Sequence, residues 1–333
     1  MRATLNKLLQ KEDLSFEEAH DVMSGIMSGQ YEDPEIGGFL MGLAVKGETA
    51  EEIAGFASAM RDKMVQAPVT VEAIDMCGTG GDGKGTFNIS TAASFVVAGA
   101  GVPVAKHGNR SISSKSGSAD VLMELGVDID MGPGKVAWCV DEIGVGFLFA
   151  PSFHPAMRHV MPARRALGVR TVFNVLGPLC NPARVKRQVI GLFTGDLTET
   201  MAKVLQLLGA ENAMLVHGND GIDEITTTGG TKVSILNGRK KIESAEFSPE
   251  TVGYPPATLE QIQGGTPAEN ARIITEIFDG TKGPYRDVVV LNAAAGLMVG
   301  GKAGSFEEGV RLGEEALDSG AAKDVLQKLV NAG

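Results

Sequence analysis

The chain has 333 residues, of which 43% are hydrophobic and 21% charged, as is typical of a soluble globular protein. Its formal net charge of −11 disfavours a general nucleic-acid-binding role, because such proteins usually carry a basic surplus. Three cysteines without CxxC spacing disfavour a disulfide framework or a structural zinc site, and no stretch is apolar enough to cross a membrane, so we expect a cytoplasmic protein.

The first 65 residues carry only helix signals. Ser15 with Glu18, and Thr49 with Glu52, form capping boxes ahead of apolar residues at helical spacing. Pro34 lies where the first turn of another helix would be, a position at which proline is tolerated. We therefore expect a small helical domain over residues 1–65.

From about residue 68 the pattern changes to short apolar runs, each followed by a turn and a helical stretch. This alternation predicts an α/β domain over residues 68–333, with a mainly parallel central sheet and helices on both faces. Asn237-Gly238 predicts an added antiparallel hairpin. Helices around residues 155–183, with Pro162 as a possible break, would pack back on the first domain and act as a hinge. The expected strands lie at residues 102–105, 145–150, 189–193, 213–216 and 288–291.

A glycine-rich turn over residues 75–83 follows a short apolar segment and offers bare backbone N–H groups to an anion. Gly78, Gly80 and Gly83 match the dinucleotide pattern GxGxxG. Asp82 would place a carboxylate beside a pyrophosphate, and Lys106 lies near the position of the expected ribose-binding acid, so a nicotinamide cofactor is disfavoured. A plain tight turn is the alternative.

An apolar helix over residues 92–100 comes next, and we expect Ser90 or Thr91 to cap it. Hydroxyls at a helix N-terminus also suit a phosphate. The loop over residues 106–118 then combines cations with serines beyond a strand, where open α/β sheets bind ligands. These donors suit several phosphate oxygens, and a solvated flexible loop is the alternative.

Two further features suggest a metal and a carboxylate. Asp223-Glu224 follows a predicted strand within a glycine-containing turn, which suits magnesium, although a solvated turn is the alternative. Four arginines lie among apolar residues between positions 154 and 181, and one of them could bind a carboxylate through two hydrogen bonds, unless the segment is a plain surface helix: Arg158, Arg164, Arg165 and Arg170. We expect structural roles for His154 and His159 because no acid accompanies them.

Ordered motifs along nearly the whole chain resemble the anthranilate phosphoribosyltransferase family. They are CGTGGD at 77–82, NIST at 88–91, KHGNRS at 106–111, SGSAD at 116–120, FAPSFHPAM at 149–157, RTVFNVLGPLCNP at 170–182, Asp223-Glu224 and LNAAA at 291–295. The resemblance implies a helical domain joined by a hinge to an α/β domain of the nucleoside phosphorylase and phosphoribosyltransferase class. It also implies a homodimer formed through the helical domain.

The resemblance implies roles for matching residues. Lys106, His107 and Arg164 would be catalytic; Gly78, Asn109 and Arg164 would bind anthranilate; and Ser90, Asp223 and Glu224 would contact magnesium, for which two ions are expected. The substrate PRPP (5-phosphoribosyl diphosphate) would contact Gly78, Gly81, Asp82, Thr86, Asn88, Ile89, Ser90, Thr91, Lys106, His107, Gly108, Asn109, Arg110, Ser111, Ile112, Ser113, Ser114 and Ser118.

The implied reaction transfers a phosphoribosyl group from PRPP to the amine of anthranilate, without nucleic-acid or membrane partners. The nearest rival is a pyrimidine nucleoside phosphorylase, which shares a glycine turn and a KHG-type loop. The Arg164 region and the modest length of the chain disfavour it. A nucleic-acid-binding relative and a nicotinamide dehydrogenase are weaker rivals.

Overall fold

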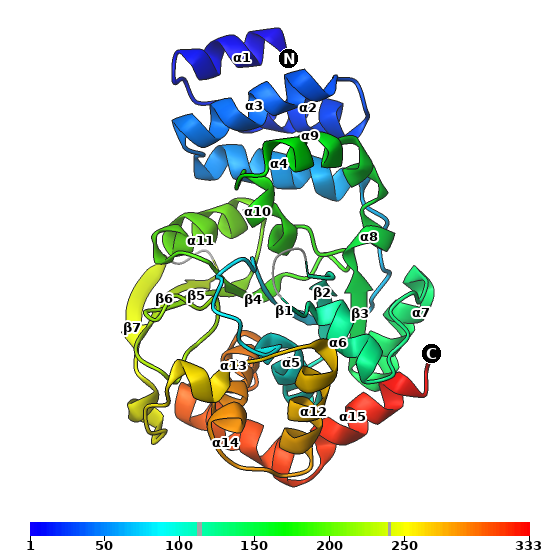
Figure 1. Ribbon diagram of the computed structural model, residues 1–333, viewed down its shortest axis with the longest axis vertical. Helices are drawn as coiled ribbons and strands as arrows, with labels where there is room; N and C mark the ends of the chain where they lie inside the picture. The colour runs from blue at the N-terminus through cyan, green and yellow to red at the C-terminus, as the bar shows by residue number, and fades with distance from the viewer. Residues whose placement is uncertain (112–114, 239–240) are drawn as a thin grey trace.

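The computed structural model describes residues 1–111, 115–238 and 241–333. Figure 1 shows three layers, with the N-terminal helices at the top, the sheet in the middle and the C-terminal helices below. In the described part of the chain, no helix combines the length and the apolar character needed to cross a lipid bilayer.

The N-terminal layer consists of four helices, as the capping signals predicted. Side-chain and backbone bonds at Ser15 and Thr49 confirm both capping boxes, and Pro34 lies in the first turn of its helix. The helices are α1 (Arg2–Leu9), α2 (Phe16–Met27), α3 (Asp33–Lys46) and α4 (Ala50–Lys63).

The middle layer is one seven-stranded sheet in the order β3-β2-β1-β4-β5-β6-β7. Strands β1 to β5 are parallel, whereas β6 and β7 are antiparallel and confirm the hairpin predicted at Asn237-Gly238. The strands are β1 (Ile74–Gly78), β2 (Val104–Gly108), β3 (Val145–Phe149), β4 (Arg187–Gly191), β5 (Asn212–Gly218), β6 (Thr231–Asn237) and β7 (Glu243–Phe247).

Helices cover both faces of the sheet, as predicted. The lower face carries α5 (Ile89–Gly99), α6 (Ser118–Glu124), α12 (Pro267–Phe278), α13 (Pro284–Val299), α14 (Phe306–Asp318) and α15 (Ala321–Val330), with α7 (Pro133–Trp138) near β3. The upper face carries α11 (Thr198–Leu207) and α10 (Phe173–Leu176), on which the N-terminal layer rests.

Alternating side chains divide the core between these faces. In β4, Val189 belongs to the lower apolar cluster and Ile190 to the upper one, and in β5 Met214 and Leu215 divide in the same way. This is the two-residue period of a strand buried on both faces. The upper cluster continues through α11 into α2, α3 and α4, so the N-terminal helices and the sheet share one core.

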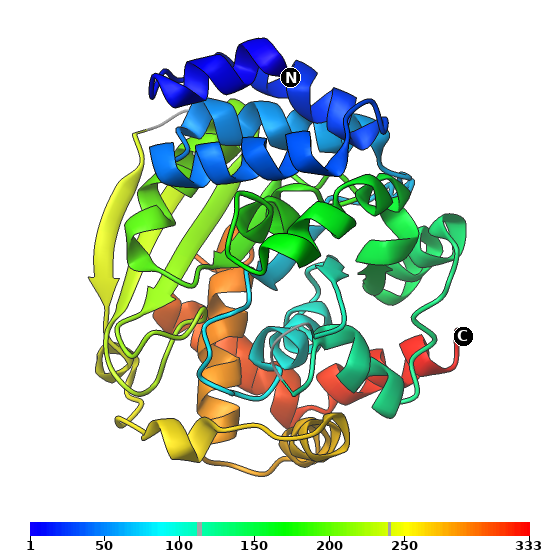
Figure 2. The same ribbon diagram turned by 45° about the horizontal axis from the view of Figure 1, so that its top comes forward.

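The chain between β3 and β4, residues 150–186 and called the middle segment below, is helical only in short pieces. It contains α8 (Ala150–Phe153), the 3-10 helix Pro155–His159, α9 (Met161–Leu167) and α10, followed by the 3-10 helix Gly177–Leu179. Pro162 lies in the first turn of α9 instead of interrupting a longer helix. Figure 2 shows this green segment lying beside the blue N-terminal helices, and α9 packs against α3.

Two sequence expectations are wrong. Residues 288–291 form no strand but lie inside α13, which is buried on nearly every side, so an apolar run has no polar face to reveal the helical period. The helix after the glycine turn begins at Ile89 with Asn88 at its N-cap, not with Ser90 or Thr91. The Asn88 side chain does not cap the helix, because its Oδ1 accepts from Ser116 Oγ (3.1 Å) and from Asn270 Nδ2 (2.9 Å) instead.

Candidate active site

The chain reverses its direction across the sheet between β1 and β4, because β2 and β3 lie on one side of this pair and β5 on the other. In open α/β sheets, ligands bind in the crevice at such a point, outside the carboxyl ends of the strands. Here the glycine turn leaves β1 beside the end of β4. Thr79 N–H donates to Gly191 O (2.9 Å), and Phe193 N–H donates to Thr79 Oγ1 (3.0 Å).

The acidic pair after β5 is bonded directly to the glycine turn and to the start of α5. Gly80 N–H donates to Asp223 Oδ2 (2.7 Å), and Ser90 N–H donates to Glu224 Oε1 (3.1 Å). Asp223 N–H lies 3.4 Å from Asp82 Oδ2. The structure thus brings the Asp223–Glu224 pair next to Asp82 and Ser90, which lie more than 130 residues earlier in the sequence.

The close approach of these segments explains two glycines. A Cβ on Gly78 would collide with the Asp223 carboxylate, and a Cβ on Gly191 would collide with the Asp223 backbone. The buried Asn292 of α13 fixes the acidic loop from below, accepting from Ile225 N–H (3.0 Å) and donating to Ile225 O (2.9 Å). The sequence assigned no role to Asn292, although it is a polar residue after an apolar run and belongs to the LNAAA motif.

Crowding changes the acidity of the pair. Burial, and after it the nearby Asp82 carboxylate, raise the pKa of Asp223 to about 7. Burial and the neighbouring Asp223 raise the pKa of Glu224 to about 8. Carboxylates that repel one another in this way favour a cation that can neutralise them.

Lys106 occupies the space beneath the glycine turn. Its side chain is buried, and Nζ donates to Met76 O (2.5 Å) and lies 3.4 Å from Ser90 Oγ. Burial lowers its pKa, although the nearby Asp75 carboxylate acts in the opposite direction. Lys106 therefore brings a positive charge close to the helix N-terminus and the acidic pair.

A buried polar network fixes the strand that carries Lys106. Asp75 accepts from His107 N–H (3.1 Å) and from Asn181 Nδ2 (2.8 Å), and the same Asn181 nitrogen donates to Ala105 O (2.8 Å). Asn181 comes from the middle segment, so this network also ties that segment to the sheet. Sequence reasoning missed both Asp75 and Asn181, because their contact spans 106 residues.

His107 faces His154 of the middle segment, with ring centroids 5.1 Å apart. Both rings are buried, and neither Nε2 has a hydrogen-bond partner among the described residues. Burial lowers the pKa of His107 to about 3 and that of His154 to about 4, so both are neutral at pH 7. Two neutral, unpartnered ring nitrogens make this pair a candidate for ligand contact, which the sequence indicated only for His107.

The loop after β2 is fixed by short-range bonds. Asp120 Oδ2 accepts from Ser111 N–H (3.0 Å) and Gly117 N–H (2.9 Å), and Ser118 Oγ donates to Asn109 O (3.2 Å). Asn88 joins this loop to α12 through Ser116 and Asn270. The expected contacts Ile112, Ser113 and Ser114 lie outside the described residues.

The other residues expected to contact PRPP differ in burial and in the groups that they could present to a ligand. Ile89 and Thr91 are buried, so Ile89 could contribute only its backbone. Thr86 forms an isolated bridge with Gln263 beside the turn. The Arg110 guanidinium lies between Asp120, 3.9 Å away, and the Phe149 ring, 6.0 Å from its centroid. Gly108 ends β2, and Gly81 follows Gly80 in the turn.

Two arginines of the middle segment point in different directions. Arg164 is half-buried, stacks 5.2 Å from the Phe173 ring centroid and has a pKa lowered by burial. No hydrogen bond or ion pair joins Arg164 to the glycine turn or the basic loop within the described residues. Arg170, which sequence reasoning did not assign, donates instead to Gly81 O of the glycine turn.

A metal would need ligands beyond the protein. The carboxylates of Asp223 and Glu224 and the hydroxyl of Ser90 are hard oxygen donors that suit Mg²⁺. Among the described residues, however, no group of three or more His, Cys, Asp or Glu side chains is arranged to hold a metal ion. The geometry fits an ion that completes its shell with substrate and water oxygens, as Mg²⁺ usually does with phosphates.

Comparisons with known proteins agree with this geometry. Residues 2–64 match the helical bundle domain and residues 70–323 the a/b domain of a glycosyl transferase family. An anthranilate phosphoribosyltransferase of Acetivibrio thermocellus is 51% identical over 331 residues, which cover 99% of this chain and 96% of the relative.

Solved structures agree as well. The enzyme of that name from Thermus thermophilus superposes with a TM-score of 0.93 at 44% identity, covering 99% of this chain and 98% of the other. The Saccharomyces cerevisiae enzyme in complex with PRPP and Mg gives 0.90 at 30% identity, and its complex with 4-fluoroanthranilate gives 0.88 at 29%, each covering 99% of this chain and 96% of the other. The chain therefore belongs to the anthranilate phosphoribosyltransferase family.

Proposed function

We propose that this protein transfers the 5-phosphoribosyl group of PRPP to the amine of anthranilate. The products are N-(5-phosphoribosyl)anthranilate and pyrophosphate, in the second step of tryptophan biosynthesis from chorismate. One observation carries the proposal: the Asp223–Glu224 pair is hydrogen-bonded to the backbone of the glycine turn and of α5. Metal-binding carboxylates and phosphate-binding N–H groups thus meet at one point of the sheet edge.

The donor substrate would lie along this edge. The glycine turn, the N-terminus of α5 and Lys106 supply N–H groups and positive charge for phosphate oxygens. We place the PRPP contacts at the residues named from the sequence. The family resemblance and the meeting of these segments at the switch point of the sheet support that placement.

Magnesium fits the donor set. Asp223 and Glu224 have pKa values raised by burial and by neighbouring carboxylates, and a divalent cation would relieve that repulsion. When bound, the ion would neutralise charge on the diphosphate leaving group. We propose Ser90, Asp223 and Glu224 as its protein contacts, with two ions per site.

The chemistry needs little acid–base help. The nitrogen lone pair of anthranilate forms a bond to C1 of the ribose, the bond from C1 to the diphosphate oxygen breaks, and the amine then loses a proton. Because an aryl amine is neutral at pH 7, no strong base is required to activate it. The protein instead has to stabilise the departing pyrophosphate and hold the reactants together.

The acceptor would lie between the middle segment and the basic loop. We propose that Arg164 binds the carboxylate of anthranilate, with Gly78 and Asn109 nearby. The neutral His107 and His154 rings lie against each other, and their buried Nε2 atoms have no hydrogen-bond partner among the described residues, so we propose that they also contact the acceptor. Since burial lowers the pKa of His107 to about 3 and that of His154 to about 4, both rings are weak bases and would position the acceptor without taking up its proton.

The assembly is also a proposal. We place a helical domain at residues 1–65 and an α/β domain at 68–333, with helices around 155–183 as the hinge between them. Closure of the two would exclude water from the reacting carbon. We further propose a homodimer through the N-terminal helices and a cytoplasmic location.

The direct test is an assay of the purified protein with PRPP, Mg²⁺ and anthranilate, followed by the loss of anthranilate fluorescence. We expect turnover that requires all three components. Thymidine with inorganic phosphate serves as the control for the phosphorylase alternative. Phosphorolysis of thymidine without use of anthranilate would refute the proposal.

A further inference from the structure

We propose that Arg170 is a positioning residue that orients the glycine turn for the diphosphate of the donor substrate. Its guanidinium donates through Nη2 to Gly81 O and lies 4.3 Å from the centroid of the Phe193 ring. This inference rests on the proposed function, since it concerns how the same site holds PRPP.

The contact with Gly81 O fixes a peptide plane. In a trans peptide the carbonyl of one residue and the N–H of the next point in opposite directions. A bond from Arg170 to Gly81 O therefore directs the Asp82 N–H away from the guanidinium. Within the described residues, the backbone N–H groups of Gly81, Asp82 and Gly83 have no acceptor, so they are available to an anion.

The turn needs such a constraint because its backbone is permissive. Gly80, Gly81 and Gly83 all have positive φ, at +64°, +74° and +71°. Glycine has no Cβ and adopts positive and negative φ about equally readily, so the backbone of the turn can change conformation at a low cost in free energy. The next peptide could therefore rotate and present a carbonyl oxygen to a phosphate. The Arg170 bond favours the orientation in which an N–H is presented instead.

Phe193 holds the guanidinium in place. It follows β4, and its own N–H donates to Thr79 Oγ1 of the same turn (3.0 Å). A planar guanidinium can stack on a ring while it donates in its plane, whereas an ammonium on a flexible chain is less constrained. Arg170 belongs to the middle segment that also carries Arg164, so it links that segment to the diphosphate side of the site.

The test compares steady-state kinetics of the full-length protein with Mg²⁺ for the wild type, Arg170→Ala, Arg170→Lys and Arg165→Ala. We expect Arg170→Ala to raise the KM for PRPP about tenfold or more, as loss of a hydrogen bond to a charged group does, and to change the KM for anthranilate less than about twofold. Arg170→Lys should restore part of the loss. The Arg165 side chain is exposed, and no hydrogen bond or ion pair joins it to another described residue, so Arg165→Ala should match the wild type.

An unchanged KM for PRPP, or equal rises for both substrates, would overturn the proposal. If Arg170→Ala does not fold, Phe193→Leu replaces it, and we expect a smaller shift in the same direction; a folded Phe193→Leu protein with wild-type kinetics would contradict the proposal. Binding of magnesium pyrophosphate by calorimetry provides an independent measurement. A wild type without transferase activity would refute the proposed function, whereas weaker pyrophosphate binding by Arg170→Ala would still support the role of Arg170.

Discussion

At the scale of single residues, the site depends on groups whose neighbours change their chemistry. Asp223 and Glu224 are acids with pKa values raised by burial and by neighbouring carboxylates, and His107 is a base kept neutral at pH 7 by burial, which lowers its pKa. The sequence indicated Asp223 and Glu224 because they follow a predicted strand, and the family resemblance indicated His107. The sequence could not predict Asp75 and Asn181, whose roles come from contacts that the tertiary fold creates.

Replacement of the acidic pair should remove the metal dependence of the reaction. Asp223→Asn with Glu224→Gln keeps the shape of both side chains but lowers their affinity for Mg²⁺. We expect turnover to fall by about 100-fold, at the upper end of the range for perturbed metal sites. A magnesium titration of the rate measures this, and an unchanged curve would reject the site. Glu250→Gln, at an exposed acid remote from the site, is the control.

Arg164 should act on the acceptor alone. A charge-assisted hydrogen bond to a carboxylate contributes roughly 1.5–3 kcal/mol, so Arg164→Ala should raise the KM for anthranilate about tenfold or more. The KM for PRPP should remain within about twofold of the wild type. Equal effects on the two substrates would remove the role assigned to Arg164. This pattern is the opposite of the one expected for Arg170→Ala.

At the scale of elements, capping and turn motifs predicted the structure where residues close in sequence determine it. The capping boxes at Ser15 and Thr49 formed as expected, and Asn237-Gly238 marked the antiparallel pair β6–β7. The pattern of apolar residues gave a wrong prediction where an element is buried on all sides. In α13, residues 288–291 are fully buried, so their apolar character could not distinguish a strand from a central helix.

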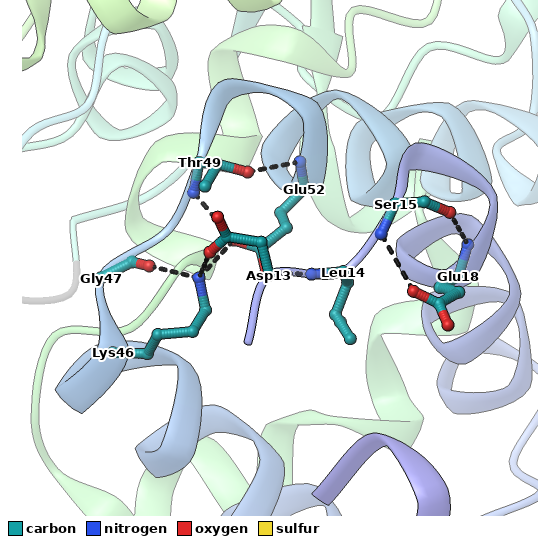
Figure 3. A network of polar contacts seen from close by, with 8 residues as sticks. All are labelled: Asp13, Leu14, Ser15, Glu18, Lys46, Gly47, Thr49 and Glu52. Atoms are coloured by element: carbon teal, nitrogen blue, oxygen red, sulfur yellow. Dashed lines mark hydrogen bonds and ion pairs between the residues drawn. The ribbon is translucent and has the colours of Figure 1, made fainter. Parts of the chain in front are cut away.

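Glu52 shows how one residue can join three elements of the N-terminal layer (Figure 3). Its carboxylate accepts from Thr49 N–H (2.8 Å) at the start of α4 and from Leu14 N–H (2.9 Å) between α1 and α2. It also accepts from Lys46 Nζ (2.9 Å) at the end of α3, and Lys46 binds Asp13 as well (2.6 Å). Glu52 is fully buried, and the Lys46 side chain is only 4% exposed.

Loss of the Glu52 charge should therefore destabilise the protein. Among the described residues, Glu52→Gln leaves the buried Lys46 ammonium with only the exposed Asp13 as a charged partner, and breaking a buried pair costs about 3–5 kcal/mol. We expect a loss of about 3 kcal/mol in the free energy of unfolding, measured by urea denaturation. Glu51→Gln, in the same turn but exposed, should cost less than about 1 kcal/mol. Similar losses in both variants would show that the network adds little.

At the scale of the whole molecule, the middle segment ties the two parts of the chain together. It packs on the N-terminal helices through α9, reaches the sheet through Asn181 and reaches the glycine turn through Arg170. The general architecture followed from the sequence, because alternating apolar runs and turns predict a parallel sheet with helices on both faces. The apolar core that the N-terminal helices share with the upper face of the sheet could not be predicted from the sequence, because the contact of α4 with α11 involves residues distant in sequence.

The buried histidine pair gives this junction a dependence on pH. His154 has a folded-state pKa of about 4, below the ordinary value of 6.5, because burial disfavours its charged form. Between these values the unfolded chain binds more protons than the folded one, so the contribution of His154 is constant above about pH 7 and becomes unfavourable as the pH falls. The raised pKa values of Asp223 and Glu224 act in the opposite sense over the same range, because those groups bind protons more readily in the folded state.

A comparison of the wild type with His154→Gln separates these opposing effects. The two acids are common to both proteins, so they cancel in the difference between the two free energies of unfolding. We expect the wild type to lose stability relative to the variant by about 1.4 kcal/mol per pH unit as the pH falls from about 6.5 to about 4. Above about pH 7 the difference should be constant. Urea denaturation across this range measures the difference. A difference that does not change with pH would show that the pKa of His154 is the same in the folded and unfolded protein.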